Sequence, residues 1–230
     1  MAGGGYRKMA DLPATIAIFP LDGAILLPGA VLPLQIFEPR YLNMIDDAMA
    51  GDRLIGMIQT RPGAPRHPTD RARPRLARVG CVGRITSYAE TGDGKYLIAL
   101  SGVCRFAAGE ELDAQAPYRR LRADFAPFEA DLDADDEALE LFERTPFMAL
   151  LERYLERRGL GVEWEAVGAA PAPALINSLC MALPFQPMEK QALLEAQGLE
   201  ERRAALAALL AIDSAAAGAD DEDDPPPAVQ

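Results

Sequence analysis

Side chains that commonly carry catalysis are few and scattered in this sequence. It contains one histidine, His67, and three lysines, Lys8, Lys95 and Lys190. His67 lies between prolines in an arginine-rich stretch, which favours a solvated loop residue and leaves a histidine triad or multi-histidine metal site without partners. No GxxxxGK[ST] phosphate-binding loop is present, so ATP hydrolysis by this chain is not expected. We predict a protein that is not an enzyme and binds no cofactor.

The three cysteines, Cys81, Cys104 and Cys180, are widely spaced and embedded in apolar runs. An odd number at such spacing suits reduced thiols in a protein core better than a disulfide framework or a zinc site. No metal is therefore expected.

Two stretches have the composition of binding sites. The first is an arginine-rich loop over residues 61–78, with a single acid and six arginines: Arg61, Arg66, Arg71, Arg73, Arg75 and Arg78. These guanidinium groups could clamp an acidic peptide or a phosphate backbone, or contact the chain's own acidic tail. The loop has no interleaved aromatic residues to stack nucleic-acid bases. A solvated loop without a ligand is the simpler interpretation.

The second stretch is the apolar loop 24–30 with the run 31–37 that follows it. An apolar groove or an exposed strand edge captures extended polypeptides through main-chain pairing and side-chain pockets. Burial against the helical second half of the chain is the alternative, and the residues do not decide between the two. The residues predicted to bind a peptide are Ile25, Leu26, Leu27, Pro28, Leu34, Ile36 and Phe37.

Composition sets the class of protein that must position these sites. The chain has 230 residues, of which half are hydrophobic, and this suffices for a core without disulfides or metals. It has neither a secretory leader pattern nor an apolar run long enough to span a membrane, which predicts a cytoplasmic protein with no membrane partner. The net charge of −12 is uneven, because residues 1–128 carry +3 and residues 129–230 carry −15. An acidic total disfavours broad nucleic-acid binding.

The first half of the chain reads as a β-rich domain. Short runs rich in Val, Ile, Leu and Tyr predict six strands, at 16–19, 31–37, 54–60, 79–87, 96–106 and 119–125. Pro33 argues for an edge or bulged position in the second strand. Pro39 opens a short amphipathic helix that ends near Gly51, and TGDGK at 91–95 supplies a hairpin turn.

The second half reads as helical. Apolar residues recur at helical spacing from about 139 to 155, with Pro146 expected to kink or divide that helix, and again in 174–183, 187–196 and 199–211. The predicted fold class is α+β, with a flexible start at 1–14, a β-rich domain at 15–128, a helical bundle at 129–213 and a disordered acidic tail at 214–230.

IFPLDGAILLPGAVLPLQIFEPRY, at 18–41, resembles the opening of the substrate-binding domain of Lon proteases. The likeness lies in Pro20 and Leu21, the Pro28-Gly29 step, and the Phe37-Glu38-Pro39 step followed by Arg40 and Tyr41. It continues in VGCVGRI at 79–85, LSGVCRF at 100–106 and the Lys-Gln pair at 190–191 before a leucine-rich segment. The resemblance covers about 15–212. It implies a PUA-like β pseudo-barrel followed by a helical subdomain.

In full-length Lon proteins this domain recognises or gates protein substrates, while separate ATPase and serine–lysine peptidase modules cut them. We expect neither module here, because none of Ser87, Ser101, Ser178 and Ser214 sits in the setting of the Lon peptidase motif. The resemblance therefore implies a non-catalytic module that binds unfolded or degron-bearing polypeptides, as an adaptor or modulator in protein quality control, either alone or beside a separate protease. An RNA-binding PUA-like module using loop 61–78 is the alternative, and a small-molecule hydrolase is a third class. The sequence does not specify an oligomeric state.

Overall fold

The computed structural model describes residues 6–61, 74–113, 116–133 and 144–220, with side chains to residue 213. These residues divide into two compact units. The first lies within Met1–Asp135 and Asn177–Glu195, and the second within Asp136–Ile176 and Ala196–Gln230. The stretch that holds α6 thus belongs with the β-rich unit, whereas the composition-based ranges placed it in the helical part. Each unit is described here by itself.

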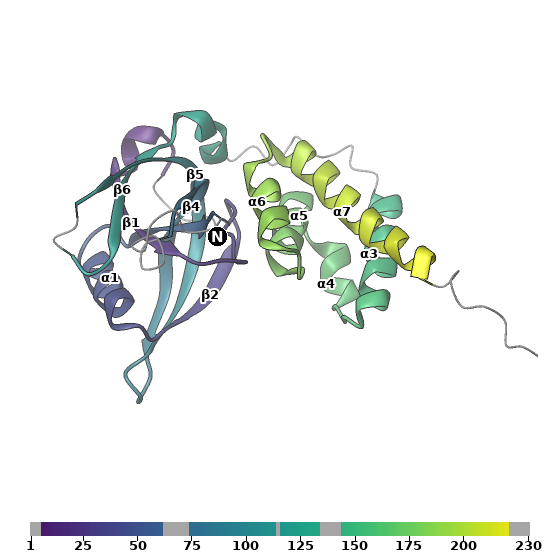
Figure 1. Ribbon diagram of the computed structural model, residues 1–230, viewed down its shortest axis with the longest axis horizontal. Coiled ribbons are helices and arrows are strands. Elements are labelled where there is room, and N and C mark those ends of the chain that lie inside the picture. The colour runs from purple at the N-terminus through teal and green to yellow at the C-terminus, as the bar shows by residue number, and fades with distance from the viewer. Residues whose placement is uncertain (1–5, 62–73, 114–115, 134–143, 221–230) are drawn as a thin grey trace, which may run out of the picture. The chain divides into compact units, whose positions relative to one another are not determined.

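The first unit is built on a six-stranded sheet in the order β2-β5-β4-β3-β1-β6 (Figure 1). Its strands are β1 (Thr15–Pro20), β2 (Val31–Ile36), β3 (Leu54–Thr60), β4 (Leu76–Glu90), β5 (Tyr96–Leu112) and β6 (Arg119–Asp124). All six strands predicted from the sequence are present, although β4 and β5 extend beyond their predicted ends. The PUA-like character of this sheet stays a prediction.

β5 closes the sheet on itself. Along one edge it pairs with β4, and along the other it pairs first with β2 at 96–101 and then with β6 at 107–112. The strands β5, β4, β3, β1 and β6 therefore form a ring, and among the described strands β2 pairs only with β5. β1 and β3 run parallel, whereas the other pairs are antiparallel.

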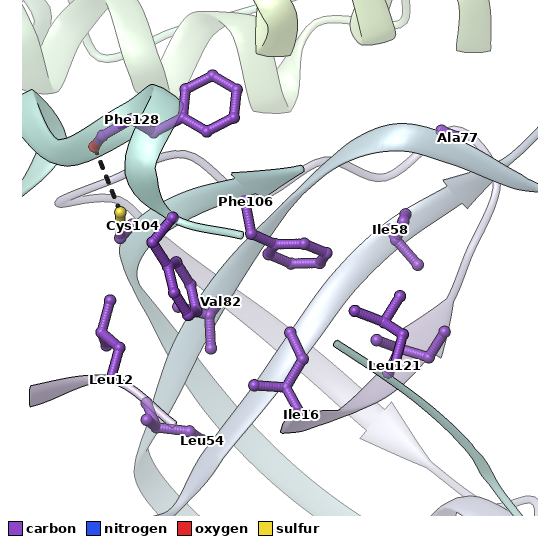
Figure 2. Packing of buried hydrophobic residues seen from close by; sticks show 12 residues of the cluster. Leu12, Ile16, Leu54, Ile58, Ala77, Val82, Cys104, Phe106, Leu121 and Phe128 are labelled. Atoms are coloured by element: carbon purple, nitrogen blue, oxygen red, sulfur yellow. Dashed lines mark hydrogen bonds between the residues drawn. The ribbon is translucent and has the colours of Figure 1, made fainter. Parts of the chain in front are cut away.

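The interior of this ring is apolar. Figure 2 shows the Phe106 ring in the middle of the cluster, among Ile16, Ile58 and Val82. Two strand glycines make room for it, because a Cβ on Gly80 would lie 2.5 Å from Phe106 Cζ and one on Gly56 would lie 3.1 Å from Phe106 Cε1. Cys104, also in the cluster, places its Sγ 3.4 Å from the carbonyl oxygen of Phe128.

Three helical elements of the first unit flank the sheet. α1 (Pro39–Ala50) begins with a proline at its first position and buries Tyr41, Met44 and Ile45. The 3-10 helix η2 (Ala126–Leu132) follows β6, and α6 (Pro187–Glu195) packs beside β4. A short 3-10 helix, η1 (Met9–Asp11), precedes β1.

The second unit is helical. It contains α3 (Arg144–Arg158), α4 (Trp164–Ala169) and α7 (Leu199–Asp220), while α5 (Ala172–Ala182) crosses the division between the units. α3 packs against α7 and buries Phe147, Leu151, Tyr154 and Leu155. Pro146 is the third residue of the described part of α3, and the kink or division predicted there stays a prediction. The part of the predicted helix before residue 144 lies outside the described residues. A bundle architecture remains a prediction.

Among the residues that the structure describes, no helix combines the length and the apolar character needed to cross a membrane.

Candidate functional site: the open edge of β2

The apolar loop before β2 lies inside the first unit. Ile25, Leu26 and Leu27 are each at most 2 % exposed, and Pro28 is half-buried. Leu26 and Leu27 pack over two glycines of the sheet. A Cβ on Gly83 would lie 2.5 Å from Leu26 Cδ2, and a Cβ on Gly102 would lie only 2.0 Å from the Leu27 carbonyl oxygen. The loop is therefore buried against β4 and β5 of its own sheet. In this conformation these three side chains cannot contact a peptide.

The loop is held in place by its backbone. Gly29 has a φ of 74°, a left-handed conformation that glycine adopts without strain, and its N–H donates to the Gly102 carbonyl at 3.0 Å. Gly102 N–H in turn donates to the Ala30 carbonyl at 2.9 Å, and Asn177 Nδ2 donates to the Pro28 carbonyl at 3.0 Å. The turn is thereby fixed at the start of β2.

β2 itself alternates between an inward and an outward face. Ile36 is buried and Leu34 is half-buried on the inward face, whereas Val31 and Phe37 are 57 % and 63 % exposed on the outward face. Leu97 of β5 stands opposite Gln35 and is 46 % exposed. Of the seven predicted peptide-binding residues, Phe37 is thus fully accessible, Pro28 and Leu34 are partly accessible, and Ile25, Leu26, Leu27 and Ile36 belong to the core. Val31 lay in the predicted stretch 31–37 but was not among the seven residues, and Leu97 was not predicted, although β-strand alternation marks both as outward-facing.

The outer edge of β2 is an open strand edge within the described residues, because β5 is its one strand partner there. The hydrogen bond from Gly102 N–H to the Ala30 carbonyl makes Ala30 and Gly102 a hydrogen-bonded pair. In an antiparallel ladder, hydrogen-bonded and non-hydrogen-bonded pairs alternate, so this pair fixes the phase of the alternation along β2 and β5. In that phase the pairs Val31–Ser101, Pro33–Ala99 and Gln35–Leu97 are non-hydrogen-bonded. The main-chain groups of Val31, Pro33 and Gln35 therefore point away from β5. We call this side the β2 edge, defined by residues 31–37.

The position of Pro33 agrees with this alternation of hydrogen-bonded and non-hydrogen-bonded pairs. A proline lacks the N–H that a ladder needs, so within a sheet it is confined to positions whose nitrogen faces outward on an edge strand. Pro33 occupies such a position and is exposed, as the sequence predicted for an edge strand.

The hairpin that adjoins the β2 edge carries an aromatic pair. Tyr88 and Tyr96 meet edge to face with ring centroids 5.0 Å apart. The Tyr96 hydroxyl donates to Asp46 of α1 at 3.0 Å, and this bond raises the pKa of the Tyr96 phenol. Tyr118 makes a similar bond of 2.7 Å to Asp47, and burial together with that carboxylate raises its pKa to about 12. Both tyrosines therefore stay protonated and tie α1 to the sheet.

The arginine-rich loop is only partly described. Arg61, Arg75 and Arg78 are exposed, and Arg61 N–H donates to the Arg75 carbonyl at 2.7 Å, which closes the base of the loop. His67, Arg66, Arg71 and Arg73 lie outside the described residues. Arg119 supports the same base by donating to the Pro74 carbonyl at 2.8 Å and to Glu111 at 2.5 Å. A role for the six arginines stays a prediction.

The described cysteine and lysine side chains that could act as nucleophiles have structural roles instead. Burial raises the pKa of Cys81 and raises that of Cys104 to about 12, so both remain protonated thiols. Burial lowers the pKa of Lys190, whose Nζ donates to the Met181 carbonyl at 2.8 Å at the end of α5. Within the described ranges, no three His, Cys, Asp or Glu side chains are grouped to hold a metal.

Buried polar contacts attach α6 to the outer face of the sheet. Arg105 of β5, 2 % exposed, forms a two-pronged pair with Asp131 of η2 at 2.8 Å and donates to the Leu194 carbonyl of α6 at 3.1 Å. Gln59 of β3, equally buried, accepts from Gly23 N–H at 2.9 Å and donates to the Pro187 carbonyl and to Gln191, each at 3.0 Å. Sequence reasoning identified Lys190 and Gln191 as a family feature but not these partners.

The second unit has a shallow hollow of about 390 Å³ beside α3, with Met148, Trp164 and Arg144 in its lining. Arg144 donates to the carbonyls of Val167 and Ala170 and thereby caps the end of α4. Both bonds come from its Nη2, while its buried Nε has no hydrogen-bond partner among the described residues.

Fold and site together define a class: an α+β domain that presents an apolar strand edge. The chain matches the family described as the ATP-dependent protease La (LON) substrate-binding domain over residues 15–211. It belongs to this family, as the motifs at 18–41, 79–85 and 100–106 indicated.

The curated relatives that the chain matches are named Lon proteases. The chain is 28 % identical over 204 residues to Lon protease 2 of Myxococcus xanthus, covering 88 % of this chain and 24 % of that protein. It is 26 % identical over 196 residues to Lon protease of Flavobacterium johnsoniae, covering 84 % of this chain and 23 % of that protein. The chain thus spans about a quarter of the length of these curated relatives.

Solved structures show the same fold. The Lon N-terminal domain protein from Xanthomonas campestris superimposes with a TM-score of 0.57 at 23 % identity, covering 86 % of this chain and 97 % of that one. The N-terminal domain of Lon protease from the Mycobacterium avium complex gives a TM-score of 0.58 at 19 % identity, covering 86 % and 98 %.

Proposed function

We propose that this chain is a non-catalytic substrate-recognition module that binds exposed apolar segments of unfolded or degron-bearing polypeptides. Its family supplies the general role, and the observation that carries the specific one is the β2 edge, where Val31 and Phe37 stand in solvent beside unpaired main-chain groups. Large apolar side chains on an open edge are a liability that soluble proteins normally cover or blunt. Binding a client segment is a function that would retain them.

The proposal extends to cellular role. A module that captures apolar segments without cutting them would act as an adaptor or modulator in protein quality control, delivering clients to a separate protease or withholding them from it. We propose a cytoplasmic setting for this activity, in keeping with the buried thiols of Cys81, Cys104 and Cys180, none of which forms a disulfide.

Binding of a fluorescein-labelled, apolar synthetic peptide, followed by anisotropy, tests the proposal. Phe37→Asp and Val31→Asp place a charge on the β2 edge at exposed positions, so the fold should persist while the dissociation constant rises about tenfold or more. Met188→Asp is the matched control, because Met188 is an apolar residue that is 71 % exposed on α6. Equal affinities of all three variants and the unchanged protein would refute the proposed site.

RNA binding through loop 61–78 is the second candidate, favoured by the exposure of Arg61, Arg75 and Arg78 at the base of that loop. Phosphate contacts would give an affinity that falls steeply with salt. We expect no binding of a single-stranded RNA oligonucleotide even at low salt. Salt-sensitive binding that is lost in the double variant Arg75→Ala, Arg78→Ala would instead establish the RNA-binding function.

A further inference from the structure

We propose that the client segment binds by strand addition, pairing its main chain with the β2 edge so that it becomes a further strand of the sheet. This inference rests on the proposed function and specifies how the same site recognises its ligand. It also assigns a role to Pro33, which limits the number of hydrogen bonds that the edge can offer.

The alternation of hydrogen-bonded and non-hydrogen-bonded pairs between β2 and β5 determines which main-chain N–H and carbonyl groups the β2 edge presents. Val31 and Gln35 each direct one N–H and one carbonyl outward, whereas Pro33 between them directs a carbonyl alone. An added strand would therefore exchange two hydrogen bonds with Val31 and two with Gln35, but one with Pro33. A polypeptide in extended conformation is the ligand whose own donors and acceptors repeat at this spacing.

The side chains next to the edge define the class of segment. Client residues opposite Val31, Pro33 and Gln35 would place their side chains on the outward face, beside the exposed Val31 and Phe37. Client residues in between would point to the other face. The favoured ligand is thus an extended segment with apolar residues at every second position, rather than a helix or a block of consecutive apolar residues.

Pro33 also accounts for the edge remaining open in a soluble protein. An edge strand with every N–H available is a template for pairing with other chains, and a central proline weakens that pairing without removing it. If two copies of this chain paired edge to edge, each would contribute a proline, and the pairing would lack two N–H donors. A client segment without proline would pair with the same edge and lack one donor. A foreign segment is therefore the preferred occupant over a second copy.

An N-methyl scan of the bound peptide tests strand addition directly. A methyl group on an amide that faces the β2 edge removes a donor and blocks close approach, whereas one on the neighbouring amide, which faces away, does neither. We expect affinity losses of about fivefold or more at every second residue and little change between them. A peptide of identical composition, with its apolar residues in one block, should bind more weakly.

Two protein variants complete the test. Gln35→Pro removes an outward N–H at a position where the strand tolerates proline, and should weaken binding about fivefold, whereas Gln35→Ala keeps the N–H and is the control. Pro33→Ala adds a donor and should tighten binding by a similar factor. These opposite signs are not expected if the site is a surface of apolar side chains alone.

The outcomes separate the two proposals. If no apolar peptide binds, the proposed function fails. If peptides bind but the N-methyl scan shows no period of two, or if Gln35→Pro and Gln35→Ala behave alike, the function stands and strand addition is refuted. Sedimentation of the protein alone over the same concentration range should show no dimer; a dimer that the peptide dissociates would make a second copy the natural occupant and overturn the choice of client.

Discussion

The positions of individual glycines determine whether the apolar loop 24–30 is buried or exposed. Ile25, Leu26 and Leu27 have the same side chains whether a loop is buried or lines a groove, so their composition left both possibilities open. Burial follows from Gly83 and Gly102, which sit on neighbouring strands and leave the space that Leu26 and the Leu27 carbonyl occupy. The glycine-containing strand motifs were recognised in the sequence, but their contact with residues 26 and 27 depends on strand register, which a sequence does not specify.

Gly102→Ala should therefore be strongly destabilising. The new Cβ would lie 2.0 Å from the Leu27 carbonyl oxygen, which is backbone and cannot rotate away. We expect a loss of about 3 kcal/mol in the free energy of unfolding, or failure to fold, measured by urea denaturation. Gly92→Ala, in the hairpin turn with no atom within 4 Å of the new Cβ, is the control and should change stability little. Similar effects of the two substitutions would contradict this account of the loop.

At the scale of elements, periodicity identified most strands and helices and missed the short ones. α4 and the two 3-10 helices are too short for an apolar period to emerge, and α4 contains no buried residue. β5 runs past its predicted end at Phe106 because its edge changes partner from β2 to β6. A change of partner is a tertiary event that local propensity does not record. Pro33, in contrast, predicted an edge or bulged position from sequence alone, and β2 has the edge position.

The contact between α3 and α7 should be acid-sensitive. Arg158 donates to Asp213 of α7 and holds the pKa of that carboxyl below its usual range, and Arg157 lies 3.8 Å from it. Because the carboxyl is more acidic in the folded state, its stabilising effect is complete above the unfolded pKa near 4 and is lost as pH falls through the folded pKa. The contribution is about 0.5 kcal/mol, since Arg158 is 45 % exposed.

Thermal unfolding between pH 6 and about pH 3 checks this contribution. Asp213→Asn should lower stability at pH 6 and remove part of the decline toward acid, so that its curve converges with that of the unchanged protein at low pH. Glu156→Gln, which neutralises an exposed carboxylate on α3, is the control. Parallel curves for Asp213→Asn and the unchanged protein at all pH values would show that this ion pair contributes nothing to the pH dependence.

At the scale of the whole molecule, the chain leaves the β-rich unit and returns to it. Composition changes near residue 128, so a sequence argument divides the chain once at that point. The structure assigns Asn177–Glu195 to the unit that contains the sheet. Buried hydrogen bonds contribute to this arrangement, since Arg105 and Gln59 donate to the carbonyls of Leu194 and Pro187.

A chain truncated after residue 135 should therefore be less stable than the intact protein, although it keeps every strand. Loss of α6 removes hydrogen-bond partners from Arg105 and Gln59, and uncovers the outer face of β4 and β5 where Cys81 lies opposite Arg105. Because water replaces the lost partners on the uncovered face, each lost hydrogen bond costs its net contribution of about 0.5–1.5 kcal/mol.

Urea unfolding and reaction with Ellman's reagent give independent measures of this loss. In the intact protein Cys81 and Cys104 are fully buried and should react slowly. In the truncated chain we expect an earlier unfolding midpoint and fast modification of one thiol, which Cys81→Ser abolishes and Cys104→Ser does not, because Cys104 faces the interior of the closed sheet. A truncated chain with the stability and thiol protection of the intact protein would show that residues 15–128 form an autonomous domain and that α6 is an accessory to it.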